Sequence, residues 1–266
     1  MFEDETGSNQ HAIERLKKGV YLLPSLITTF GFFSGFYALI AVFNENYYYA
    51  AWAILFAGFF DFMDGKVARL TNTTSDFGVQ YDSLSDLMSF GIAPAFLAYS
   101  WVLQPYGRIG WMASFLYAIC GALRLARYNV HAGSGEVIGN KFIGLPIPAA
   151  AGFIASIVIL ANDFLVIEKV HPMIIVATVY FLAFLMVSNV RYISFKKLGF
   201  NKRRPFSMLV FMILFIYIIA TIPELMLFIL AATYAISGPA DWLYKRWFRK
   251  RTDEKVEDPH AKPEKQ

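Results

Sequence analysis

Residues 19–44 read GVYLLPSLITTFGFFSGFYALIAVFN, a run of 26 residues without a charged side chain. About 20 apolar residues in a helix span the hydrocarbon core of a bilayer, so this run predicts a membrane-crossing helix. The whole chain agrees with this prediction, because 57% of its 266 residues are apolar or aromatic and only 17% are charged. The single cysteine, Cys120, cannot form an intramolecular disulfide, which excludes a disulfide-stabilised secreted protein.

Seven further apolar runs follow, and several of them are only about 15 residues long. We expect those helices to continue past the charged residue that ends each run, with that residue facing protein or water. The fold class predicted is therefore all-α, a polytopic membrane protein with about eight transmembrane helices. The last two runs could also form one helix with a proline kink. The seven runs are Asn46–Phe60, Leu87–Tyr106, Ile109–Leu123, Phe142–Asn162, Pro172–Val190, Pro205–Pro223 and Leu225–Ala240.

Basic residues are divided unequally between the two sides of this predicted arrangement. One side receives 22 of the 24 Lys and Arg residues, and only Arg108 and Lys169 fall on the other. Short cytoplasmic loops carry the excess of positive charge in membrane proteins, so both termini are expected in the cytoplasm. We expect a cell-membrane protein with a cytoplasmic segment at 1–20, a membrane-embedded domain at 21–240 and a basic, disordered cytoplasmic tail at 241–266.

Four aspartates occur at helical spacing near the ends of two apolar runs. Asp61 and Asp64 are three residues apart, and Asp82 and Asp86 are four residues apart, so each pair shares one helix face. Two such helices packed side by side would bring the four carboxylates together. Their mutual repulsion near hydrocarbon requires protons or cations to neutralise them.

Divalent metal is the natural partner for such a cluster. Carboxylate oxygens suit Mg²⁺ or Mn²⁺, which keep coordination positions free for water and for substrate phosphates. The sequence thus predicts metal-assisted phosphate chemistry. Small residues at Gly65, Ala68 and Gly78 leave room for a flat group beside the helices, although small residues also serve close helix packing. Arg69 could pair with a phosphate or mark the membrane boundary.

These positions together resemble the signature of the CDP-alcohol phosphatidyltransferase family. The pattern is Asp61-x2-Asp64-Gly65-x2-Ala68-Arg69-x8-Gly78-x3-Asp82-x3-Asp86. The resemblance implies a membrane enzyme with six core helices, here extended by a C-terminal pair, that transfers a phosphatidyl group from a CDP-linked lipid to an alcohol and releases CMP. It also implies a homodimer.

The resemblance further implies roles for individual residues. Asp61, Asp64 and Asp82 would be the principal metal ligands, and Asp86 would be the general base that can also touch metal. The residues around the cytidine diphosphate would be Gly65, Ala68, Arg69 and Gly78, with Thr28 of the first run as a candidate contact.

Other segments resemble the phosphatidylserine synthase branch of this family, which uses CDP-diacylglycerol and L-serine. The resemblance extends from Leu23 to Lys197. A serine site must hold a carboxylate and an ammonium, so arginines and an asparagine at the cytoplasmic helix ends are candidates, although each arginine alone is more often a topological anchor. The candidates are Arg191, Arg127, Arg124 and Asn129. The segments that carry the resemblance are Ser85–Ala95, Leu123–Asn129, Phe142–Ala151 and Met186–Tyr192.

Two alternatives stay open on the sequence alone. The acceptor could be glycerol 3-phosphate or an inositol phosphate, whose additional charge calls for a denser basic pocket. Acidic residues within membrane helices can also mark a cation or proton transporter. Transport predicts carboxylates near the middle of the membrane, whereas these carboxylates lie near predicted cytoplasmic helix ends.

Overall fold

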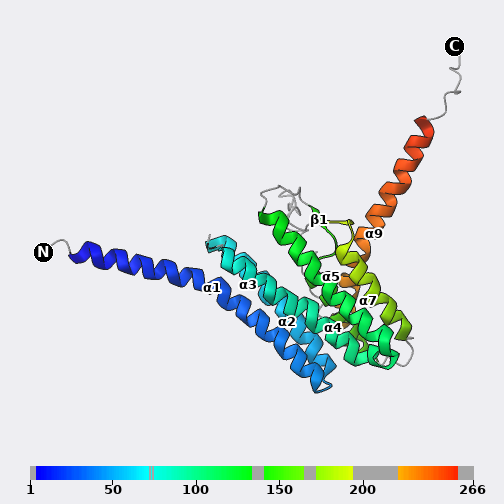
Figure 1. The fold of residues 1–266 in the computed structure, drawn as a ribbon, viewed down its shortest axis with the longest axis horizontal. Helices are drawn as coiled ribbons and strands as arrows, with labels where there is room; N and C mark the ends of the chain where they lie inside the picture. The colour runs from blue at the N-terminus through cyan, green and yellow to red at the C-terminus, as the bar shows by residue number, and fades with distance from the viewer. Residues whose placement is uncertain are drawn as a thin grey trace, which may run out of the picture.

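The computed structural model describes residues 4–71, 73, 75–133, 141–164, 172–193 and 221–256. Helix is the dominant secondary structure in this part of the chain, and one pair of three-residue strands accompanies it. The helices are α1 (Asp4–Phe43), α2 (Tyr47–Thr71), α3 (Asp76–Asp86), π-helical η1 (Leu87–Ile92), α4 (Ala93–Ala98), π-helical η2 (Tyr99–Leu103), 3₁₀-helical η3 (Gln104–Tyr106), α5 (Gly107–Gly133), α6 (Ile147–Phe164), α7 (Pro172–Val187) and α9 (Pro223–Val256), and the strands are β1 (Lys141–Ile143) and β2 (Arg191–Ile193). They pack as a bundle from which the start of α1 and the end of α9 project (Figure 1).

Three stretches of the described residues are long and apolar enough to cross a membrane: Leu23–Phe43, Asp76–Val130 and Pro223–Lys245. Two shorter apolar helices, Ile147–Asn162 and Met173–Val187, accompany them. A chain with this set of helices has the character of a membrane protein. The predicted run at 205–223 falls almost entirely outside the described residues.

The longest of these stretches, Asp76–Val130, reverses its direction at Gly107. This glycine has φ 52° and ψ −120°, a conformation that side chains with a Cβ rarely adopt. From Gly107, α5 returns along η1, α4 and η2, so one helical stretch supplies the two runs predicted at Leu87–Tyr106 and Ile109–Leu123. The predicted continuation of short runs past charged residues also occurs, because α2 passes Asp61 and ends at Thr71.

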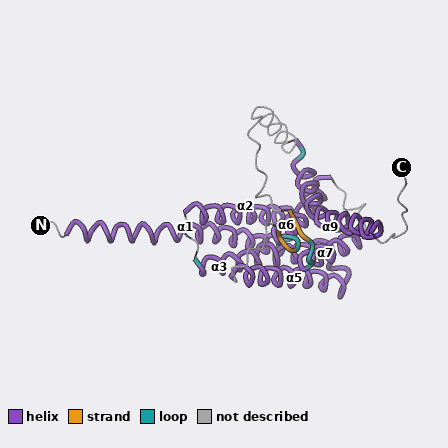
Figure 2. The backbone as a smooth tube through the Cα atoms, turned by 90° about the horizontal axis from the view of Figure 1, so that it is seen from above, coloured by secondary structure: helices purple, strands orange, loops and turns teal. Residues whose placement is uncertain are grey.

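The predicted run Phe142–Asn162 needs one correction, because it begins with a short strand. β1 pairs antiparallel with β2, with Phe142 opposite Tyr192. Gly144 then turns the chain at φ 79°, and Pro146 disfavours a helical conformation at the residue before it. Helix α6 therefore begins only at Ile147. The strand pair lies beside α9 (Figure 2).

Part of the predicted C-terminal tail is helical. Helix α9 extends without interruption to Val256, so residues 241–256 are not the disordered segment that their charge suggested. An ion pair between Asp241 and Lys245, one turn apart, shows how an exposed charged helix can gain stability from its own side chains.

Alanines fill the contact between α1 and α2, the two helices of the first hairpin. Ala38, Ala50 and Ala57 have no exposed surface, and side chains of this size allow two helix backbones to approach closely. Large apolar side chains lie on the outer surface instead: Phe43 is 81% exposed and Phe184 is 69% exposed. This distribution suits a protein whose surroundings are lipid.

Candidate functional site

Three of the four predicted aspartates converge at one end of the bundle. Asp61 and Asp64 lie in the second half of α2, and Asp82 lies in α3. One carboxylate oxygen from each of the three is within 4.8 Å of the other two. Asp64 is only 4% exposed, and Asp61 and Asp82 are half-buried. The site thus concentrates negative charge in partly dehydrated surroundings.

No lysine or arginine among the described residues forms an ion pair with these three carboxylates. Hard cations such as the divalent ions prefer oxygen ligands of this kind. The donor set therefore fits a metal ion, and the group formed by Asp61, Asp64 and Asp82 could hold one.

Asp86 lies outside this group of three but within its electrostatic field. Its carboxylate is repelled by Asp61, Asp64 and Asp82 and attracted by Arg124. Asp86 is the last residue of α3, and the π-helical segment η1 begins at the next residue. Short π-helical segments are frequent at functional sites, because they redirect side chains within a longer helix.

The first helix reaches the carboxylates through Thr28. This side chain is 5% exposed, and its hydroxyl donates to the carbonyl oxygen of Pro24 at 3.0 Å with the Asp64 carboxylate as a second hydrogen-bonding neighbour. Ser85 holds α1 in this position, since its hydroxyl donates to the carbonyl oxygen of Thr28 at 3.3 Å. Ser89 does the same one turn later, with Gly31 as acceptor at 3.2 Å.

The small residues predicted around the nucleotide lie near the carboxylates, and one has a local structural reason. The amide of Gly78 donates to the hydroxyl oxygen of Ser75 at 3.0 Å, which caps α3. A Cβ on Gly78 would lie 3.1 Å from that oxygen, whereas at Gly65 the nearest atom, on Arg69, would be 3.7 Å away. Ala68 is half-buried, and Arg69 is exposed and attracts the Asp61 carboxylate.

Three of the four predicted acceptor residues lie along the end of α5, and they differ in their surroundings. Arg124 is half-buried, and its Nε is a buried donor without a hydrogen-bond partner among the described residues. Arg127 donates from Nη2 to Oδ1 of Asn189 at 2.8 Å. Asn129 donates from Nδ2 to the Ser83 hydroxyl at 2.9 Å. The fourth candidate, Arg191, begins β2 and lies opposite Ile143, and its side chain is outside the description.

Sequence reasoning missed the residues of α9 and β2 that lie near these arginines. Tyr234 of α9 is an electrostatic neighbour of Arg124, and its ring packs at a tilt against that of Tyr192 of β2, with 5.6 Å between ring centroids. No spacing rule could have linked residues 124, 192 and 234, because only the packing of α9 brings them together. Tyr192 ends one of the segments that resemble the serine-using branch, which was the one available signal.

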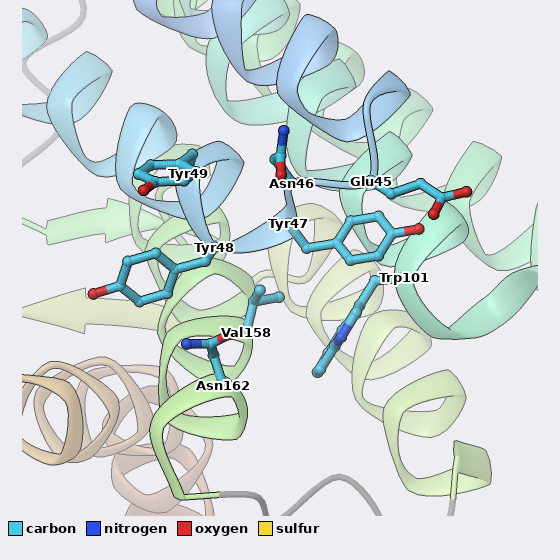
Figure 3. A pocket seen from close by; sticks show the side chains of 8 residues that line it. All are labelled: Glu45, Asn46, Tyr47, Tyr48, Tyr49, Trp101, Val158 and Asn162. Carbon is cyan, nitrogen blue, oxygen red and sulfur yellow. The ribbon is translucent and has the colours of Figure 1, made fainter.

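A separate cavity of about 380 Å³ lies away from this site. Figure 3 shows its lining residues, which include Glu45, Tyr47 and Trp101. It opens beside the turn between α1 and α2. That turn is about 20 Å along α2 from Asp61, since a helix rises 1.5 Å per residue. The cavity has no contact with the convergent carboxylates.

The fold and the site define a class of protein: a helical membrane protein with a carboxylate cluster able to hold metal at a helix end. Residues 21–183 match the CDP-alcohol phosphatidyltransferase family, and the chain belongs to this family. It is 36% identical over 225 residues to a CDP-diacylglycerol–serine O-phosphatidyltransferase of Helicobacter pylori (strain ATCC 700392 / 26695), covering 85% of this chain and 92% of the relative.

Two further relatives have related names. A CDP-diacylglycerol–serine O-phosphatidyltransferase of Bacillus subtilis (strain 168) is 35% identical over 175 residues, covering 66% of this chain and 92% of the relative. An archaetidylserine synthase of Methanothermobacter thermautotrophicus (strain ATCC 29096 / DSM 1053 / JCM 10044 / NBRC 100330 / Delta H) is 40% identical over 136 residues, covering 50% of this chain and 56% of the relative. The chain is thus similar over most of its length to enzymes named for phosphatidyl transfer to serine.

Proposed function

We propose that this chain transfers the phosphatidyl group of CDP-diacylglycerol to L-serine and releases CMP. The observation that carries the proposal is the juxtaposition of two features: three convergent carboxylates, and Asp86 facing Arg124 beside them. The first feature suits a nucleoside diphosphate with its metal, and the second suits an acceptor that has both a hydroxyl and a carboxylate. Relatives at 35–36% identity that are named for this reaction support the choice of serine.

Asp61, Asp64 and Asp82 would hold Mg²⁺ or Mn²⁺, which when bound neutralises charge on the pyrophosphate and on departing CMP. Asp86 contacts the serine hydroxyl and takes its proton onto a carboxylate oxygen as the phosphatidyl group is transferred. Its position one helical turn from Asp82 and its exclusion from the convergent group support this separate role.

The nucleotide lies against the second half of α2 and the start of α3. Gly65 and Ala68 leave space there, and Arg69 and the backbone near Gly78 contact the cytidine diphosphate. Thr28 contributes from α1, and its hydrogen-bonding position beside Asp64 supports this assignment. Holding a lipid-linked nucleotide and a water-soluble acceptor at one helix end supplies proximity for the reaction.

The serine carboxylate is held by Arg124. The buried Nε without a partner supports this assignment, because a buried donor that stays unpaired destabilises the protein and a carboxylate oxygen would satisfy it. The proposed binding site for serine also includes Arg127, Arg191 and Asn129. Their positions near the end of α5 and in β2 support a shared location.

The topology proposed has eight transmembrane helices in the cell membrane, with both termini and the active site on the cytoplasmic side. The distribution of 22 basic residues against two supports this orientation. Within it, residues 1–20 precede the membrane-embedded domain at 21–240, and 241–266 follow it. The assembly proposed is a homodimer, on the basis of the family resemblance.

Purified protein incubated with CDP-diacylglycerol and Mn²⁺ or Mg²⁺ tests this function directly. L-Serine, glycerol 3-phosphate and an inositol phosphate are supplied in parallel reactions, and CMP release is measured. The proposal predicts CMP release that depends on serine and on the metal. Release only with one of the two phosphorylated alcohols would reassign the acceptor, and no release with any acceptor would contradict the enzyme function.

A further inference from the structure

The side chain of Tyr192 joins the strand pair to the C-terminal helix. Tyr192 has no exposed surface, and its hydroxyl donates to the carbonyl oxygen of Ala235 in α9 at 3.1 Å. Its ring packs at a tilt of 39° against the ring of Tyr234 of the same helix. Since Tyr192 lies opposite Phe142 in the two-stranded ladder, these contacts fasten the whole ladder to α9.

The ring of Tyr192 occupies a notch that exists only because residue 238 is glycine. A Cβ on Gly238 would lie 2.7 and 2.8 Å from two ring carbons of Tyr192 and closer still to a third. The ring cannot move aside at little cost, because it is fully buried, packed against Tyr234, and its hydroxyl is hydrogen-bonded. Any larger residue at position 238 must therefore separate α9 from β2 or displace Tyr192.

The contact between Tyr192 and α9 is connected in two ways to the arginines at the end of α5. Through α9, Tyr234 lies close enough to Arg124 for the two side chains to interact electrostatically. Through the segment before β2, Asn189 accepts a hydrogen bond from Arg127 at 2.8 Å, three residues before Tyr192. The same segment is tied to the start of α6, because the amide of Gly144 donates to the carbonyl oxygen of Val190 at 2.8 Å.

We propose that α9 is a positioning element for the acceptor, in which the contacts of Tyr192 with Tyr234 and Gly238 hold Arg124 and Arg127 in the arrangement that binds serine. This inference rests on the proposed function, since it assigns a device that sets the affinity for serine. The family match ends at residue 183, before β2 and α9. Because the clustered carboxylates lie on α2 and α3, we expect α9 to affect acceptor binding and not the transfer of the phosphatidyl group.

Steady-state kinetics on the full-length protein separates the two substrates. Gly238→Ala should raise KM for serine about tenfold, which corresponds to about 1.4 kcal/mol and is comparable with the loss of one hydrogen bond to a charged group. KM for CDP-diacylglycerol and kcat should both change by less than about twofold, because the carboxylate group lies on α2 and α3.

Two further variants make the test independent of how well Gly238→Ala folds. Tyr234→Phe keeps the ring that packs against Tyr192 and removes the hydroxyl of this electrostatic neighbour of Arg124, so it should raise KM for serine in the same selective way. Gly152→Ala is the matched control, because its added Cβ would be 4.0 Å from the nearest atom, on Leu55. This control should keep both KM values.

The outcomes distinguish this inference from the proposed function. Unchanged KM for serine in both Gly238→Ala and Tyr234→Phe would overturn the inference, as would parallel changes in both KM values and kcat, which indicate a general structural role. Absence of serine-dependent CMP release by the wild-type protein would instead overturn the proposed function, and it is visible before any variant is measured.

Discussion

Replacing Asp82 with asparagine should stabilise the metal-free protein and weaken the stabilisation that divalent metal provides. An Asp82 oxygen lies within 4.8 Å of oxygens from Asp61 and Asp64. Two full charges 4.8 Å apart repel by about 3.5 kcal/mol at an effective dielectric constant of 20. Asp82→Asn removes its repulsion with both neighbours, so in EDTA the variant should unfold at a higher temperature than the wild-type protein.

Divalent metal should stabilise the wild-type protein more than the variant, so the variant's advantage should shrink as metal is added. A protein at a free metal concentration 100 times its Kd gains about 2.7 kcal/mol, and a variant with hundredfold weaker binding gains about 0.4 kcal/mol. For chains of about 150–250 residues, a gain of 1 kcal/mol in the free energy of unfolding raises Tm by about 2–4 °C. Mn²⁺ should therefore raise the apparent Tm of the wild-type protein by about 5–11 °C. The corresponding gain for Asp82→Asn should be about 1–2 °C.

Thermal unfolding of detergent-solubilised protein, in EDTA and in a series of Mn²⁺ concentrations, measures both effects. Asp76→Asn is the matched control, because Asp76 is an exposed aspartate in the first turn of the same helix and is not in the convergent group. The control should respond to Mn²⁺ as the wild-type protein does. Equal stabilisation of Asp82→Asn and the wild-type protein by Mn²⁺ would refute the reasoning.

Three further substitutions have defined outcomes. Asp86→Asn should lower kcat about 10²- to 10⁴-fold while CDP-diacylglycerol still binds, and unaltered turnover would remove Asp86 from its role as base. Gly35→Ala should destabilise the protein by about 1–3 kcal/mol, because the added Cβ would lie 2.7 Å from the Cα atom of Ser89. An unchanged Tm would show that α1 can move aside. Tyr117→Phe should cost about 1 kcal/mol with little effect on KM, since it removes a buried hydrogen bond of 3.2 Å to the carbonyl oxygen of Phe90; a selective loss of serine affinity would contradict this purely structural role.

The local rules of helices account for what could be predicted from the sequence. Apolar runs predicted where helices occur, because length and composition alone decide whether a helix suits a bilayer. The spacing of Asp61 and Asp64 predicted a shared face, and the structure places both carboxylates with that of Asp82. These inferences use only neighbours within a few residues, for which helical geometry is known in advance.

Features that depend on packing between distant segments could not be predicted in this way. The strands around Phe142 and Tyr192 are three residues long and 50 residues apart, so neither segment signals the pairing by itself. The contact of Thr28 with Asp64 depends on how α1 packs against α2. Similarly, nothing in the charged sequence after residue 240 indicated that α9 continues to Val256.

The central claim is that Asp61, Asp64 and Asp82 hold a divalent ion in contact with the pyrophosphate of the CDP-linked lipid. Electron–nuclear double resonance on Mn²⁺ bound to the purified protein tests this claim most directly. Addition of CDP-diacylglycerol should produce a ³¹P hyperfine coupling at the Mn²⁺ signal, and Asp64→Ala should lose both bound Mn²⁺ and the coupling. Tightly bound Mn²⁺ that shows no ³¹P coupling with CDP-diacylglycerol, or that survives Asp64→Ala unchanged, would contradict it.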